Sequence, residues 1–186
     1  MKSMSGSVKL LLALMGGSFI FGIQPARAVE VNIKITGEIH IPPCKINGND
    51  TEILVPFGRM SLYDVNGQNN AQTKTVKVSC DYYQGTPYVR IDGTVLQGAG
   101  NNVLQTTGAN PSALGIALYQ GSDVNTAYPL RTGAGEQYGY KIKRGFTGQN
   151  SASGTFTFTA VPVKYGSKAL TAGTFSAMAT MSISYL

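Results

Sequence analysis

Apolar and polar residues alternate strictly over residues 29–41, "VEVNIKITGEIHI". Aliphatic residues hold the odd-numbered positions and polar residues hold the even-numbered ones. Gly37 is the one exception on the apolar side. A period of two predicts a β-strand with one apolar face and one polar face.

This predicted strand is unusually long. Thirteen residues at about 3.3 Å each reach roughly 43 Å, whereas a typical strand reaches about 17–20 Å. It is therefore a long internal strand, a projection without structure, or a strand that inserts into another molecule. Aliphatic side chains in register would be wasted in water, which favours insertion over the unstructured alternative. Gly37 marks either a close approach of two backbones or a β-bulge.

Shorter β-branched and aromatic runs between turn residues predict the rest of the fold, with seven or eight strands in all. They occupy residues 52–57, 75–80, 87–92, 114–121, 138–143, 154–163 and 175–186. Residues 114–121 ("LGIALYQG") are almost continuously apolar, which predicts a strand buried on both faces. No helical periodicity, linker or repeat interrupts the pattern. The prediction is one all-β sandwich domain.

Residues 1–28 have the features of a signal peptide. Lys2 and Lys9 give a positive start, "LLLALMGGSFIFGI" gives a short apolar run, and "ARA" ends at a small residue, Ala28. The alternative is an uncleaved membrane anchor, which the short and glycine-broken run disfavours. Cleavage would leave 186 − 28 = 158 residues, a normal size for one domain.

Charge and composition exclude several classes of protein. The mature segment carries 12 basic and 9 acidic residues, hence +3, without the dense basic stripe that nucleic-acid binding requires. His40 is the only histidine, no two acids suggest a catalytic carboxylate pair, and no glycine-rich loop leads into a helix. We therefore expect no enzyme, no cofactor, no nucleic acid and no small-molecule substrate.

The two cysteines, Cys44 and Cys80, predict one disulfide, because an even number of cysteines in a secreted chain is usually oxidised. A metal site is disfavoured, since two cysteines and one histidine do not complete a tetrahedral zinc site.

Several motifs together resemble the pilins of the chaperone–usher pathway. They are the alternating N-terminal extension with its central Gly37, the spacing of Cys44 and Cys80, Gly173 fourteen residues from the end, and the penultimate Tyr185. More narrowly, "IPPCKIN", "NNVL", "LGIALYQG", "TFTFTAVP" and "ATMSISY" are similar to the minor tip-adaptor subunits of P-like fimbriae. The resemblance covers the whole mature chain.

The resemblance implies an incomplete immunoglobulin-like sandwich that a donated strand completes. It divides the chain into a signal peptide (1–28), a donor-strand extension (29–40) and a pilin domain (41–186). The implied donor residues are Val31, Ile33, Ile35, Gly37 and Ile39. The implied acceptor groove, which first binds a chaperone, is lined by Gly173, Ala177, Ala179, Met181, Ile183 and Tyr185. From the residues alone, the last strand could equally be an ordinary inner strand with Tyr185 covering the rim.

The resemblance also implies a function and partners. The chain would be a minor subunit that links the adhesin to the pilus tip, after passing through the periplasm to the bacterial surface. Its partners would be a periplasmic chaperone, an outer-membrane usher, neighbouring pilins and the adhesin. Alternative roles are a repeating tip-fibrillum subunit or a major rod subunit. A carbohydrate-binding adhesin module, with Tyr82, Tyr83 and Tyr88 stacking on sugar, is the alternative from another class.

Overall fold

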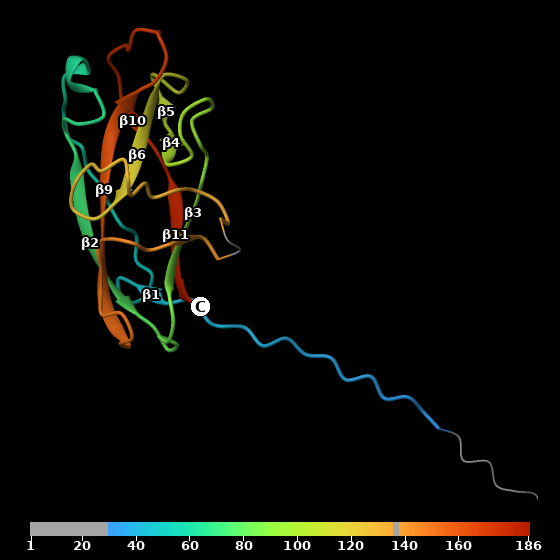
Figure 1. The fold of residues 1–186 in the computed structure, drawn as a ribbon. Coiled ribbons are helices and arrows are strands. Elements are labelled where there is room, and N and C mark those ends of the chain that lie inside the picture. Colours follow the sequence, from blue (N-terminus) through green and yellow to red (C-terminus); the bar gives the residue numbers. More distant parts are fainter. Residues whose placement is uncertain (1–29, 136–137) are drawn as a thin grey trace, which may run out of the picture. The chain divides into compact units, whose positions relative to one another are not determined.

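The computed structural model describes residues 30–135 and 138–186 of the chain. The predicted signal peptide, residues 1–28, lies outside the described residues. The chain divides into two units, with the boundary between Glu38 and Ile39. In the first unit, residues 30–38 form neither helix nor strand. The second unit is a β-sandwich (Figure 1).

The larger sheet is antiparallel and has the strand order β1-β2-β9-β6-β4, with β8 also pairing with β9. Its strands are β1 (Lys45–Ile46), β2 (Gln72–Ser79), β4 (Val103–Gln105), β6 (Leu114–Gln120), β8 (Phe146–Thr147) and β9 (Ser153–Lys164). The two longest strands, β2 and β9, pair in register from Gln72↔Ala160 to Ser79↔Ser153. They form the centre of this layer.

The second layer is smaller and has the strand order β11-β3-β7. Its strands are β3 (Pro87–Gly93), β7 (Tyr140–Lys141) and β11 (Ala179–Tyr185), and a separate pair joins β5 (Thr107–Gly108) to β10 (Phe175–Ser176). A short 3₁₀ helix, η1 (Leu62–Asp64), is capped by the Ser61 hydroxyl, which accepts from the Tyr63 N–H. Within the described residues, no helix is long and apolar enough to cross a membrane.

The core lies between the two sheets, because alternate side chains of each sheet point inward. Val76 and Phe156 from the larger sheet and Val89 and Ile183 from the smaller one are at most 2% exposed. A second, smaller cluster packs Leu96 and other apolar residues on β4, β6 and β9. Burial of this apolar surface is the main favourable term in the stability of the sandwich.

Most strands predicted from the sequence are present, with shorter or shifted ends. The segment 114–121 forms β6, whose residues are all buried except the half-buried Tyr119, as its continuous apolar pattern predicted. The strand predicted at 138–143 is limited to β7, Tyr140–Lys141. The prediction of a strand at residues 52–57 is wrong, because these residues make no β-ladder with any described segment. The physical reason is that no described strand lies beside them as a hydrogen-bonding neighbour.

Candidate strand-binding site

Among the described residues, strand β11 has a strand neighbour on one side only. It pairs with β3 from Ala179↔Gly93 to Tyr185↔Pro87. On the other side, the Cys44 N–H donates to the Ile183 carbonyl at 2.7 Å. Backbone groups of successive strand residues point to opposite sides, so Ala179 and Met181 present their N–H and C=O groups to the same side as Ile183. Within the described residues, no backbone hydrogen bond satisfies those groups of Ala179 and Met181.

Residues 52–57 lie opposite this unpaired side. Their burial alternates: Ile53, Val55 and Phe57 are half-buried against the main core, while Leu54 is exposed. No backbone hydrogen bond joins residues 52–57 to any other described segment. The segment thus has the side-chain pattern of a strand without the ladder of one.

Residues 52–57 and the unpaired side of residues 175–181 face each other. The Phe57 and Phe175 ring centroids are 6.0 Å apart, and both rings pack against the main core. At the other end, the Cys44 N–H bonds to the Ile183 carbonyl. Residues 44–57 and residues 175–183 therefore run in opposite directions. We call the gap between residues 53–57 and residues 175–181 the open edge.

One extended strand is what the open edge lacks. A strand placed there would pair its backbone with Ala179 and Met181 on one side and with residues 52–57 on the other. Its inward side chains would cover Ile53, Val55, Ala177 and Met181, which are half-buried without it. An unpaired apolar edge of this kind is prone to association with other strands.

A hollow of about 340 Å³ lies at the Phe175 end of the open edge. Its lining includes Leu62 and Tyr63 from η1, Asn110, Leu170, Gly173 and Phe175. Asn110 links two segments that line the hollow, because its side-chain amide donates to the Thr171 carbonyl (2.8 Å) and accepts from the Thr171 N–H (2.9 Å). A Cβ at Gly173 would lie 2.6 Å from Ala109 Cβ, so this position requires glycine or movement of the neighbouring chain.

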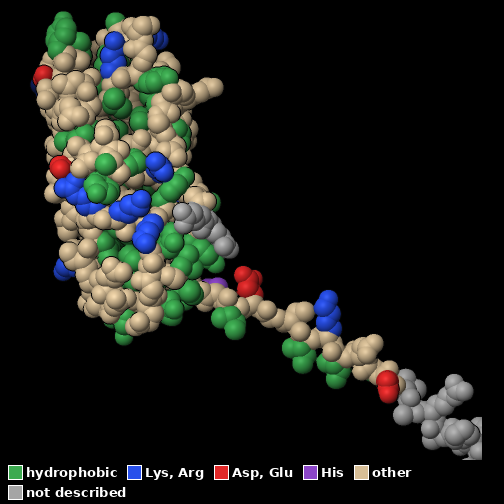
Figure 2. Space-filling model, viewed as in Figure 1, with side chains coloured by type: hydrophobic (Ala, Val, Ile, Leu, Met, Phe, Trp, Pro, Cys, Tyr) green, Lys and Arg blue, Asp and Glu red, His purple; other side chains and the backbone are tan. Residues whose placement is uncertain are grey.

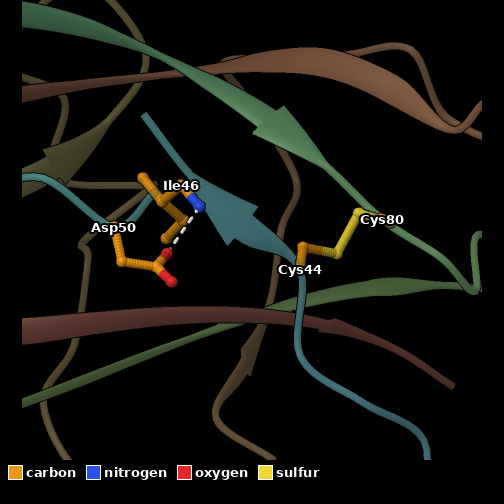
Figure 3. Close-up of a disulfide and its surroundings, with 4 residues drawn as sticks. All are labelled: Cys44, Ile46, Asp50 and Cys80. Carbon is orange, nitrogen blue, oxygen red and sulfur yellow. Dashed lines mark hydrogen bonds between the residues drawn. A yellow bond between two sulfur atoms is a disulfide. The ribbon is translucent and has the colours of Figure 1, made fainter. Parts of the chain in front are cut away.

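The disulfide closes the opposite end of the open edge. Cys44 and Cys80 are bonded, as their number predicted, and join the start of β1 to the end of β2 (Figure 3). Beside it, the turn after β1 is held by Asp50, whose carboxylate accepts from the Ile46 N–H at 2.8 Å. The cross-link therefore fixes Cys44 next to Ile183, where the gap between the two walls ends.

The groove residues predicted on the last strand fall into three groups. Ile183 and Tyr185 are fully buried beside the disulfide end. Ala177 and Met181 are half-buried along the open edge, and Ala179 is exposed. The parity of this strand predicts one wall of the open edge, whereas the sequence alone predicts only an ordinary strand for the other wall, residues 53–57. Its alternating apolar residues were the available signal.

Tyr185 lies in an unusual environment. Its ring contacts Phe146 edge-on at 6.2 Å between centroids, and its hydroxyl is buried with no hydrogen bond of good geometry among the described residues. Burial raises the pKa of the Tyr185 hydroxyl, and the nearby backbone of Asn150 offsets part of that increase. The Tyr185 side chain is therefore a neutral phenol in the core whose hydroxyl lacks a well-formed hydrogen bond within the described residues.

The predicted donor residues that the structure describes are all exposed. Val31, Ile33 and Ile35 expose 77%, 84% and 90% of their surface, and Ile39 is fully exposed. In Figure 2 the hydrophobic side chains of this segment lie along one side of it. Among the described residues, no atom lies within 4 Å of a Cβ built at Gly37.

Other candidate sites find little support in the described residues. No three His, Cys, Asp or Glu side chains are grouped there as metal ligands. Tyr82 and Tyr83 lie in the loop between β2 and β3, where Tyr83 packs against the core and Tyr82 is 40% exposed. Tyr88 is half-buried on β3. Tyr83 is therefore poorly placed to stack on a sugar, as the carbohydrate-binding alternative would require.

Comparisons with known proteins agree with this geometry. A family model described as "Fimbrial protein" matches residues 33–186. The chain is 40% identical over 156 residues to the fimbrial adapter PapF of Escherichia coli, which covers 84% of this chain and 88% of PapF. It is 39% identical, with the same coverage, to the minor fimbrial protein PrsF of Escherichia coli.

Solved structures show the same fold. A structure of the P pilus adaptor subunit PapF matches with a TM-score of 0.53 at 35% identity, covering 80% of this chain and all of that one. The P pilus rod subunit PapA matches with a TM-score of 0.53 at 18% identity, covering 83% and 100%. Both are pilins with an incomplete immunoglobulin-like sandwich, which is the fold found here.

Proposed function

The chain belongs to the fimbrial protein family, and we propose that it is a minor pilin of the adaptor type that both accepts and donates a strand. The observation that carries this proposal is the open edge, whose two walls lack a common strand neighbour in the part of the chain that the structure describes. A neighbouring subunit would supply that strand, and main-chain bonds would give affinity while inward side chains fix register.

The donor in this proposal is the N-terminal extension. The open edge of a second subunit would receive the side chains of Val31, Ile33, Ile35 and Ile39. Gly37 would lie where that subunit leaves little room for a side chain. Burying four aliphatic side chains at about 1.5–3 kcal/mol each gives roughly 6–12 kcal/mol before ordering costs. A contribution of that size suits a link in a fibre that bears load.

The adaptor role rests on the named relatives. The relatives that are 40% and 39% identical are described as an adapter and as a minor fimbrial protein. We infer that this chain likewise joins an adhesin to the pilus tip, rather than repeating along the tip fibrillum or rod. A structural role of this kind needs no catalytic residue, and we propose none.

The route to the pilus follows from the same proposal. Residues 1–28 would direct export and be removed, which leaves an extension at 29–40 and a pilin domain at 41–186. In the periplasm, a chaperone would cover the open edge until an outer-membrane usher brings the next subunit. The exposed apolar surface along the open edge is the physical reason for such protection.

The test is to co-purify the mature chain with the other subunits of its fibre and find the strand in its open edge. Cysteines at Ala179 of this chain and along each neighbour's extension would trap the pair as a disulfide. We expect the N-terminal segment of one other subunit to be trapped. Trapping of no foreign strand, with the chain nevertheless present in fibres, would contradict the proposal.

A further inference from the structure

Two exposed apolar side chains flank the open edge on its outer face. Leu54 exposes 67% of its surface and Met178 exposes 84%. On each wall the neighbouring residues turn inward, since Ile53 and Val55 pack against the core on one side and Ala177 does so on the other. The side chains of Leu54 and Met178 therefore point outward, away from the core.

Extended geometry on both walls, counted from the Phe57–Phe175 contact, places Leu54 and Met178 at about the same level of the open edge. The two walls run in opposite directions, and Phe57 faces Phe175 with 6.0 Å between ring centroids. Leu54 is three residues before Phe57, and Met178 is three residues after Phe175. Three residues on each wall advance about 10 Å from the aromatic pair in the same direction.

A strand in the open edge would have one outward side chain between these two. Neighbouring strands are about 4.8 Å apart, so directly opposed side chains on one face are in contact. An apolar side chain at that position would be covered by Leu54 and Met178 together. A charged or amide side chain there would lose water on both sides without gaining a partner.

We propose that Leu54 and Met178 select the donated strand by its outer face and favour a strand with an apolar residue between them. The inference rests on the proposed strand acceptance. It adds the outward side chains of the donated strand to the inward ones as a determinant of which strand binds. This chain's own extension fails the criterion, because its outward residues are all polar: Glu30, Asn32, Lys34, Thr36 and Glu38. The pair thereby disfavours addition of a second copy of this chain, through penalties against the wrong strand.

The experiment uses the mature chain and labelled peptides of residues 29–41, which contain its own extension. The parent peptide is compared with three peptides that carry Asn32→Leu, Lys34→Leu or Thr36→Leu, and binding is measured by fluorescence anisotropy. We expect one of the three to bind about tenfold more tightly than the parent, which corresponds to 1.4 kcal/mol. The gain should disappear in a Leu54→Ser/Met178→Ser variant and persist in Tyr82→Ser, a control that removes an exposed side chain elsewhere.

The outcomes separate this inference from the proposed function. The double variant must still bind the parent peptide, which shows that it folds and accepts a strand. Equal binding of all four peptides, or a gain that survives in the double variant, overturns the selection by Leu54 and Met178 while leaving strand acceptance intact. Failure of every peptide to bind the unmodified chain, including the three leucine peptides, overturns the selection by Leu54 and Met178, whereas strand acceptance itself is decided by the trapping of a neighbour's strand. Loss of chaperone capture in the double variant, with peptides binding equally, would assign the pair to the chaperone and overturn the inference.

Discussion

At the scale of single residues, Tyr185 shows a conflict between packing and hydrogen bonding. Its ring fills the core against Phe146, but its buried hydroxyl lacks a well-formed hydrogen bond among the described residues. A buried hydroxyl without a partner costs free energy relative to water. The sequence identified Tyr185 by its position, but did not show that the ring would be fully buried.

Replacing Tyr185 by phenylalanine should leave the free energy of unfolding unchanged or raise it by about 1 kcal/mol, because it removes an unsatisfied group. The pKa of Tyr185 is raised in the fold, so the unfolded chain ionises first as the pH rises above about 10. The unmodified chain should therefore lose stability above that pH, and Tyr185→Phe should lose less. Urea unfolding of the strand-bound subunit at about pH 8 and about pH 10.5 measures both effects. A less stable phenylalanine variant at pH 8 would show that the hydroxyl is satisfied.

The disulfide has a predictable effect on stability. Cys44 and Cys80 are separated by 36 residues, and a loop of that length corresponds to about 4 kcal/mol in the chain-entropy account. A Cys44→Ser/Cys80→Ser variant should lose stability of that order, measured by urea unfolding with a strand bound. The unmodified chain under reducing conditions should match the variant. Unchanged stability in either would mean that the cross-link adds little to the packing around β1.

At the scale of elements, residues 52–57 show where prediction from the sequence stops. Alternation of Ile53, Val55 and Phe57 correctly indicates an extended segment with one inward face. It does not form a strand in the structure, because a strand is defined by its hydrogen-bonded neighbour and no described segment of this chain supplies one. Period and propensity are properties of one segment, whereas pairing depends on a second.

The wall formed by the last strand offers a matched pair of substitutions. Met181 faces the open edge, and its neighbour Ser182 is on the opposite face, paired with Arg90. Met181→Asp should weaken binding of a donor-strand peptide by at least about a hundredfold, because the carboxylate would be buried without a partner. Ser182→Asp should bind as the unmodified chain does. Equal effects of the two variants would place the donated strand somewhere other than the open edge.

The extension should be separable from the acceptor function. A chain that lacks residues 29–36 loses Val31, Ile33 and Ile35, which are exposed in the described structure. We expect this variant to bind a donor-strand peptide with unchanged affinity, and to fail to join an acceptor subunit in an exchange assay followed by gel electrophoresis. A variant that also loses peptide binding would show that the extension supports its own domain.

At the scale of the whole molecule, the sequence predicted the all-β sandwich, the disulfide and the parity of the last strand. It did not predict that β11 would have a single strand neighbour within residues 30–135 and 138–186, since incompleteness leaves no trace in composition or period. That idea came from the resemblance to pilins, and the pairing of β11 and the isolation of residues 52–57 now support it. The same features explain why a bound strand should stabilise the chain, by roughly 4 kcal/mol at a thousandfold excess over its Kd.

Amide hydrogen exchange at the open edge tests the central claim most directly. The mature chain is measured with and without a bound donor-strand peptide. The account predicts that the amides of Ala179 and Met181 exchange quickly in the free chain and become protected when the strand binds. Those of Ser182 and Ser184, which already face β3, should change far less. Protection of Ala179 and Met181 before any strand is added, or no protection after it binds, would contradict the account.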